Sequence, residues 1–303
     1  MALFKDINNS GSGIAKNTQR KRGIGDFFKI FGRKFWNLFT INMLYMLFFI
    51  PLVLSIVCFR VGGPVGTILA IVFFIGFAAV FGPSTGSFFR VMRAYSLEQP
   101  LFMSHTFFKT FKRDYFKNLA WGIVNILVVI SAYCSFTIYP KYFGDSPLKY
   151  VCLVIVAFIV LTVVMMDFYF FFLSTSTQLS MKDTVKDSFC LVSIGLKKNL
   201  ITLVISVVVF AAFFIFFYVL GILFMLFFFP AAFIGLVIAY NCYPYIQKYI
   251  INPYYREKGE INPELEFEYA KDVAIFKDMG GKEKPVVIDK KVKTKRKGGK
   301  DIS

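Results

Sequence analysis

The sequence has a single histidine, His105, and no nucleotide-binding loop of the Gly-x-x-x-x-Gly-Lys type. One histidine cannot build a His-based metal site, and that type of phosphate cradle needs the glycines and lysine of the loop. His105 lies between Ser104 and Thr106, where a capping or surface role is typical. The sequence shows no grouping of acid, base and nucleophile, so we expect no enzymatic activity and no cofactor.

Cysteine is sparse, and its spacing excludes the common structural zinc motifs. The five cysteines are Cys58, Cys134, Cys152, Cys190 and Cys242. Buried free thiols are the favoured interpretation, because cysteine commonly behaves as a small apolar residue. A disulfide among Cys58, Cys134 and Cys152 stays open, since all three lie near the outer ends of predicted membrane helices.

Acidic residues are also few, with 18 Asp and Glu against 35 Lys and Arg, and long stretches carry almost no charge. A helix needs about 20 predominantly apolar residues to cross the hydrocarbon core of a bilayer. A chain in lipid must also satisfy its own backbone hydrogen bonds, which favours helices. The sequence therefore predicts an all-α, polytopic membrane protein with six transmembrane helices. These are Leu38–Phe59, Val65–Gly82, Leu119–Tyr139, Tyr150–Leu173, Leu200–Gly221 and Phe229–Ile251.

The polar ends of the chain define its domain organisation. Residues 1–22 are predicted to be a disordered cytoplasmic segment, 23–255 a helical membrane domain, and 256–303 a largely disordered basic tail. Within the tail, Glu264–Asp278 has helical spacing of apolar residues and is followed by Gly280-Gly281. A signal peptide begins with a short charged region and an apolar core. This N-terminus instead stays polar for about 35 residues, so we expect the first span to be retained as an anchor.

The basic residues are distributed unevenly around the predicted spans. Assigning Lys and Arg to alternating sides places 32 on one side and only Arg60, Lys141 and Lys149 on the other. Short loops on the cytoplasmic side accumulate Lys and Arg. We therefore expect a cell-membrane protein with both termini in the cytoplasm.

The sharpest basic cluster is Lys290–Lys297, in the tail. Basic clusters beside a membrane attract anionic lipid headgroups, at about 1 kcal/mol per residue near the surface. The cluster has no interleaved aromatic residues for base stacking. We expect a lipid-facing or solvated tail, and no specific nucleic-acid partner.

A segment near the N-terminus recurs later in the chain. Phe27–Arg33 returns 80 residues on as Phe107–Arg113, and each copy leads to an Asn-Leu step. These steps begin at Asn37 and Asn118, and a third follows at Asn199, each 81 residues after the last. The pattern predicts a threefold internal repeat of about 81 residues. Each unit would hold an interfacial helix, an Asn that caps the next span, and two membrane helices.

The predicted interfacial helices are amphipathic, with aromatic residues on one face and basic residues opposite. Such helices suit the headgroup region of a bilayer. A third one opens at Ser180 with a capping-box pattern that includes Asp183. The predicted lipid or partner contacts are Phe27, Phe28, Lys29, Arg33, Phe107, Phe108, Lys109 and Arg113.

Asp167 is the only acid well inside a predicted span. Intramembrane acids usually face the bundle interior or water. Pro83 and Pro244 occupy nearly equivalent repeat positions, and matched breaks of this kind point to transport sites. The plainer interpretation, which we favour, is that helices end at these prolines. The candidate functional residues are Gly82, Pro83, Ser84, Thr85, Asp167, Asn241 and Pro244.

The segment Phe81–Arg93, with its Gly82-Pro83-Ser84-Thr85 core, resembles the Gly-Pro-(Ala/Ser)-Thr segment of the YesL-like bacterial membrane proteins. Phe107–Leu119, Met181–Leu200 and Asn241–Pro244 fit the same likeness, which covers most of residues 25–255. The resemblance implies a multi-pass membrane protein of uncharacterised role, in a family often associated with ATP-driven carbohydrate importers.

Taken together, the sequence favours a non-enzymatic accessory or regulatory component, with sugar importer subunits and the anionic bilayer surface as partners. The alternative of a different class is a small transporter or channel that uses the Pro83, Asp167 and Pro244 region. A membrane enzyme is the weakest of the three interpretations.

Overall fold

The computed structural model describes residues 23–144, 146–218, 230–259 and 262, and within these ranges every regular element is a helix. Predictions for residues 1–22, for the Glu264–Asp278 helix and for the Lys290–Lys297 cluster lie outside the described residues. The all-α prediction is confirmed for the part of the chain that the structure describes. The elements are α1 Ile24–Arg33, α2 Phe35–Leu47, α3 Ile50–Val61, α4 Gly63–Ser96, α5 Met103–Arg113, α6 Tyr115–Phe143, α7 Leu148–Ser176, α8 Met181–Ile194, α9 Leu196–Tyr218, α11 Ala231–Ile246, the π-helix η1 Gln247–Ile251 and α12 Asn252–Lys258.

Four helices are long and apolar enough to cross a membrane: α4, α6, α7 and α9. The pair α2 and α3 adds a fifth if it is counted as one span, although it bends by 43°. Pro51, in the first turn of α3, explains the break, because it has no N–H to continue the helix from α2. The described residues therefore contain four or five candidate spans instead of the predicted six. The last predicted span, Phe229–Ile251, is helical from Ala231 onward but is divided into the 16-residue α11 and the π-helix η1.

Three short helices, α1, α5 and α8, each precede a long helix after a single residue: Lys34, Asp114 and Gly195. Ser180 caps α8 as predicted, and its hydroxyl accepts a hydrogen bond of 3.2 Å from the Asp183 N–H. The capping role predicted for the three asparagines is wrong, since Asn199 lies inside α9. Asn37 and Asn118 lie inside α2 and α6, whose N-caps are Lys34 and Asp114. The threefold repeat stays a prediction.

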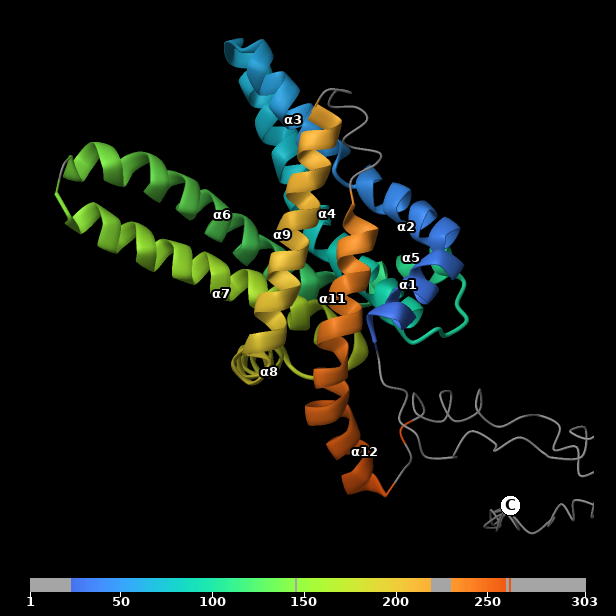
Figure 1. The fold of residues 1–303 in the computed structure, drawn as a ribbon. Coiled ribbons are helices and arrows are strands. Elements are labelled where there is room, and N and C mark those ends of the chain that lie inside the picture. The colour runs from blue at the N-terminus through green and yellow to red at the C-terminus, as the bar shows by residue number, and fades with distance from the viewer. Residues whose placement is uncertain (1–22, 145, 219–229, 260–261, 263–303) are drawn as a thin grey trace, which may run out of the picture.

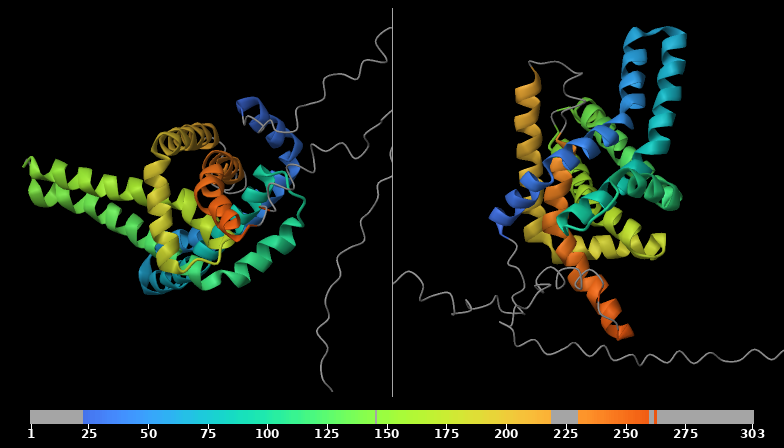
Figure 2. Two further views of the ribbon diagram at one scale, coloured as in Figure 1. Left: turned by 90° about the horizontal axis from the view of Figure 1, so that it is seen from below. Right: turned by 90° about the vertical axis from the view of Figure 1, so that its right-hand side faces the viewer.

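α4 is the central helix of the structure and packs against α3, α5, α6, α7 and α11. Two antiparallel hairpins extend from this centre (Figure 1). One consists of α3 with the N-terminal half of α4, and the other of α6 with α7. α9 and α11 run beside each other, and α12 continues beyond the end of α11. The two further views show the same divergence of the hairpins (Figure 2).

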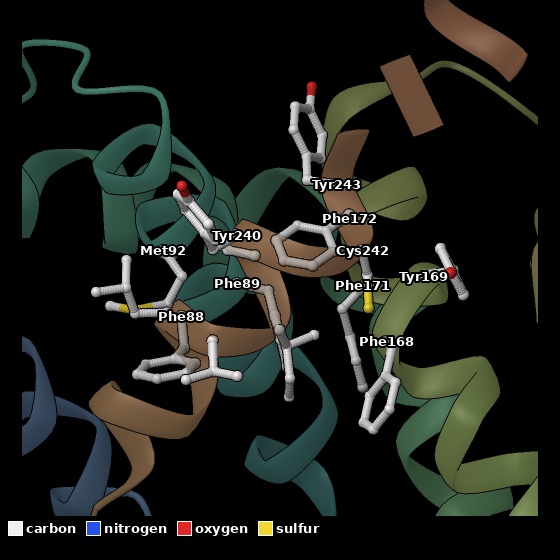
Figure 3. Packing of buried hydrophobic residues seen from close by; sticks show 14 of the residues in the cluster. Phe88, Phe89, Met92, Phe168, Tyr169, Phe171, Phe172, Tyr240, Cys242 and Tyr243 are labelled. Carbon is white, nitrogen blue, oxygen red and sulfur yellow. The ribbon is translucent and has the colours of Figure 1, made fainter. Parts of the chain in front are cut away.

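The buried core lies where the C-terminal halves of α4 and α7 pack against α11. Aromatic rings fill it (Figure 3). Phe89 of α4 stacks on Phe171 of α7 with ring centroids 5.7 Å apart, and Phe172 packs edge-on against Tyr243 of α11 at 5.6 Å. Every residue of α7 from Phe168 to Thr175 is buried. A segment that is apolar on all faces is stable only when other helices surround it, and this segment is so placed.

Candidate functional site at the crossing of α4, α6 and α7

The closest helix crossing joins α4 to α6 through glycines. A Cβ added at Gly122 of α6 would lie 2.7 Å from the Gly82 Cα of α4. A Cβ at Gly82 would in turn overlap the Asn118 carbonyl oxygen, and one at Gly86 would overlap the Asn118 side chain. Small residues four apart let membrane helices approach closely. Gly82 and Gly86 have this spacing on α4, so the crossing depends on glycine at both positions.

Pro83 lies inside α4, which continues through it for 13 residues to Ser96. The prediction that a helix ends at Pro83 is therefore wrong. Proline has no N–H to donate to the carbonyl four residues earlier, which belongs to Ala79. The Tyr115 hydroxyl of α6 donates a hydrogen bond of 3.1 Å to that carbonyl. A neighbouring helix thus supplies a donor where the proline removes one.

Asn118 is fully buried at this crossing and ties α6 to α7. Its side-chain oxygen accepts a hydrogen bond of 2.5 Å from the Ser174 hydroxyl of α7. Its amide nitrogen faces Gly86 and has no hydrogen-bond partner among the described residues. A buried polar atom without a partner costs free energy. The oxygen of the same side chain therefore carries the polar contact between the two helices.

Asp167 of α7 is held by two side chains of α6. Trp121 Nε1 and Asn125 Nδ2 both donate to Asp167 Oδ1, at 2.6 and 2.9 Å. The Trp121 ring also stacks on Phe170, with centroids 4.4 Å apart, so packing fixes the orientation of this donor. A carboxyl group within an apolar helix is stabilised by such donors, because removing a polar group from water without a hydrogen bond costs free energy.

Thr85 is linked to the neighbourhood of Asp167 through α2. The Thr85 and Tyr45 hydroxyls lie 2.9 Å apart in a hydrogen bond, and the Tyr45 phenol is within electrostatic range of the Asp167 carboxylate. The Tyr45 ring stacks on Phe88 with centroids 4.5 Å apart. Tyr45 therefore links Thr85 to the neighbourhood of Asp167.

Asn241 belongs to a different contact, between α11 and α9. Asn241 Nδ2 donates to the Thr202 hydroxyl at 3.0 Å. One turn away, the buried Asn199 side chain accepts a hydrogen bond of 2.6 Å from the Tyr169 hydroxyl. Pro244 lies inside α11 and precedes the π-helix η1, so here too the predicted helix end is wrong. Asn241 is therefore bonded to α9, apart from the hydrogen bonds that Thr85 and Asp167 make with α2 and α6.

The predicted lipid or partner contacts divide between core and surface. Phe27 and Phe107 are buried in the core; Phe27 packs edge-on against Phe233 and Tyr240, and Phe107 packs against Phe48. Their predicted role as surface contacts is therefore wrong. The aromatic faces of α1 and α5 pack inward, because apolar rings are more stable against other helices than at a wet surface. Phe28, Lys29, Phe108 and Lys109 are exposed as predicted.

The two arginines of the predicted contact set have partners within the protein. Arg33 forms an ion pair with Glu98, which follows the end of α4. Arg113 forms a two-pronged ion pair with Asp114, and its Nη2 also donates to the Thr175 carbonyl at 2.9 Å. Hydrogen bonding to Asp114 raises the pKa of the Arg113 guanidinium above its ordinary value. Both arginines therefore stabilise the tertiary structure, although their side chains are also exposed on α1 and α5.

All five cysteines are free thiols in the structure. Cys242 is buried, whereas Cys134 and Cys190 are exposed and the other two are half-buried. The prediction of free thiols is confirmed, but burial holds only for Cys242. Groups of three or more metal-ligating side chains are absent from the described part of the chain.

Several residues of this site were not identified from the sequence. Trp121, Asn125 and Tyr45 are uncharged and lie inside apolar stretches of the sequence, so they do not stand out as Asp167 does. The spacing of Gly82 and Gly86 is a recognised packing pattern and could have indicated the crossing. Comparison of the chain with models of protein families, with curated proteins and with solved structures finds no match.

Proposed function

We propose that this chain is a non-enzymatic accessory or regulatory membrane protein, serving a carbohydrate-uptake system as its likeness to the YesL-like proteins implies. The observation that supports this role is the closed packing of the centre. Gly82 and Gly122 are in backbone contact, and aromatic stacks fill the space from Trp121 to Tyr243. A centre packed in this way suits a component that holds its shape while it binds other subunits.

The proposed topology places both termini and the short helices α1, α5 and α8 on the cytoplasmic side of the cell membrane. The three basic residues assigned to the other side support it. Arg60 lies at the tip of the α3–α4 hairpin, and Lys141 and Lys149 lie at the tip of the α6–α7 hairpin. In α3, α4, α6 and α7 the remaining basic residues are Arg90, Arg93 and Lys117. They lie at the opposite ends of these helices, which supports a cytoplasmic position for those ends.

The alternative function is a small transporter or channel, and one observation favours it. Asp167, with its donors Trp121 and Asn125, lies within apolar helices. Ionisable groups within membrane spans commonly mark substrate or ion pathways. Asn241, which the predicted transport site also required, instead donates to Thr202 of α9.

Affinity purification in mild detergent, combined with transport assays in liposomes, separates the two functions. We expect importer permease subunits to co-purify equally with the wild type and with Asp167→Asn, and we expect liposomes to show no flux. Asp187→Asn, on the short helix α8, is the matched control for loss of one carboxylate. Flux of a sugar or ion that disappears in Asp167→Asn and persists in Asp187→Asn would establish the transporter instead.

The proposed sidedness has its own test in intact cells. Single cysteines at Ser10, Ser146 or Lys300 are introduced into a cysteine-free chain. An impermeant thiol reagent should label Ser146→Cys in intact cells, and Ser10→Cys and Lys300→Cys only after permeabilisation. Labelling of position 10 or 300 in intact cells would reverse the topology.

A further inference from the structure

Basic side chains from three helices meet at the C-terminal end of α7. Arg90 of α4 and Arg113 of α5 both donate to the Thr175 carbonyl, at 3.4 and 2.9 Å. Lys117 of α6 donates to the Leu179 carbonyl at 2.9 Å. The guanidinium of Arg93 lies beside them and donates to the Ser176 hydroxyl at 2.6 Å. The three residues Arg90, Arg113 and Lys117 are called the α7-end cluster below.

Among the described residues, the α7-end cluster carries more positive charge than its partners balance. Asp114 is the carboxylate within electrostatic range of all three cations, and it is already bonded to Arg113. The other acceptors are neutral carbonyls. Arg90 also lies within range of the like charges of Arg93 and Arg113. The C-terminal dipole of α7 offsets about half a charge, which leaves a positive surplus.

The position of the α7-end cluster indicates which anion fits. Asp114 is the single residue between the short helix α5 and the membrane helix α6, so the cluster lies where the chain enters the bilayer. Beside Lys117, the Phe116 side chain is 82% exposed and continues the apolar outer surface of α6. An anion held here would have an apolar surface next to it, as a phosphate joined to acyl chains requires.

We propose that the α7-end cluster binds a phosphate group, supplied by the headgroup of an anionic phospholipid or by free phosphate. Guanidinium groups suit this ligand, because their N–H donors match phosphate oxygens in pairs. Arg113 and Lys117 would exchange their backbone carbonyl partners for oxygens of the phosphate. The positive charge of the more buried Arg90 would attract the phosphate from the protein side. This inference rests on the lipid contact of the proposed function, and it requires no importer subunit.

The test uses the full chain in nanodiscs and measures bound lipid by native mass spectrometry. Phosphatidylglycerol is titrated into zwitterionic discs; separately, inorganic phosphate is added to discs without anionic lipid, and thermal unfolding is followed. The double variant Arg113→Gln/Lys117→Gln removes two of the three cations. Lys197→Gln/Lys198→Gln at the start of α9 is the matched control, because it removes the same charge from exposed positions outside the predicted contact set.

We expect the cluster variant to weaken phosphatidylglycerol binding about 30-fold, because each lost charge-assisted hydrogen bond to the phosphate costs at least about fivefold. The control variant should weaken it less than threefold, because its lysines do not contact the bound headgroup. Binding of phosphatidylglycerol without a response to inorganic phosphate identifies the lipid as the source. Stabilisation by inorganic phosphate, lost in the cluster variant alone, identifies free phosphate. Equal losses in the two variants, or no binding by the wild type, would overturn the proposal. Circular dichroism of each variant separates loss of the site from loss of the fold. These outcomes do not depend on whether importer subunits co-purify.

Discussion

The Tyr115 hydroxyl donates to the backbone carbonyl of Ala79, the group that Pro83 leaves without its helical N–H. Tyr115→Phe should therefore destabilise the protein by about 1 kcal/mol, the usual value of one hydrogen bond. The free energy of unfolding in mixed micelles measures this cost. In a Pro83→Ala background the restored N–H occupies the same carbonyl, so the cost of Tyr115→Phe should fall. An unchanged cost in that background would show that the two residues are not coupled.

Gly122→Ala should be strongly destabilising, because the new methyl group would lie 2.7 Å from the Gly82 Cα, where backbone cannot move aside. We expect a loss of about 1–3 kcal/mol or more, as for other overpacked sites. Gly76→Ala in α4 is the control, because a Cβ there meets nothing within 4 Å. It should leave stability unchanged or slightly raised. Equal effects at the two positions would mean that helix propensity, and not the crossing, decides the outcome.

Asp167 can be separated into its charge and its role as an acceptor. Asp167→Asn keeps an oxygen for Trp121 Nε1 and Asn125 Nδ2, so stability should stay close to that of the wild type. Asp167→Leu leaves both donors without this acceptor and should cost about 1–3 kcal/mol. Thermal unfolding in detergent compares the two variants. A loss in Asp167→Asn as large as in Asp167→Leu would show that the negative charge itself stabilises the site.

Phe107 and Phe108 are adjacent but should respond very differently to truncation. Phe107 is fully buried against Phe48, whereas Phe108 is 46% exposed. Phe107→Ala should cost about 3–5 kcal/mol, in line with other buried phenylalanines. Phe108→Ala should cost less than about 1 kcal/mol, typical of surface substitutions. Unfolding free energies of the two variants check the inward orientation of the α5 aromatic face. A larger loss for Phe108 would reverse it.

Glu98 adopts a positive φ of 56°, a conformation that costs non-glycine residues about 1 kcal/mol, and it pairs with Arg33. Glu98→Ala loses the ion pair and keeps the strained backbone, whereas Glu98→Gly loses the ion pair and relieves the strain. We expect the glycine variant to be more stable than the alanine variant by about 1 kcal/mol. The two melting temperatures, measured side by side, decide this. A more stable alanine variant would contradict the proposed strain.

The sequence predicted the helical architecture because apolar runs of bilayer length have few alternatives in lipid. It also named Thr85 and Asp167 among the candidate functional residues. It could not predict that Pro83 and Pro244 lie within continuous helices, because that depends on groups far away in the chain, such as the Tyr115 hydroxyl. The inward orientation of Phe27 and Phe107 was missed for a similar reason. An aromatic helix face can pack equally well against lipid or against protein. Only the contacts of Phe27 with Phe233 and of Phe107 with Phe48 show that these faces pack against protein.

The length of α4 has a mechanical consequence. Its 34 residues form a rod of about 51 Å, whereas the hydrocarbon layer is about 30 Å thick. The residues from Gly82 onward pack closely against α6, α7 and α11. This packing prevents α4 from shifting along its own axis. In a thinner bilayer, the N-terminal half of α4 would therefore have to tilt together with α3. Pro83 lies between this N-terminal half and the closely packed C-terminal half of α4. A change in bilayer thickness would therefore bend α4 at Pro83.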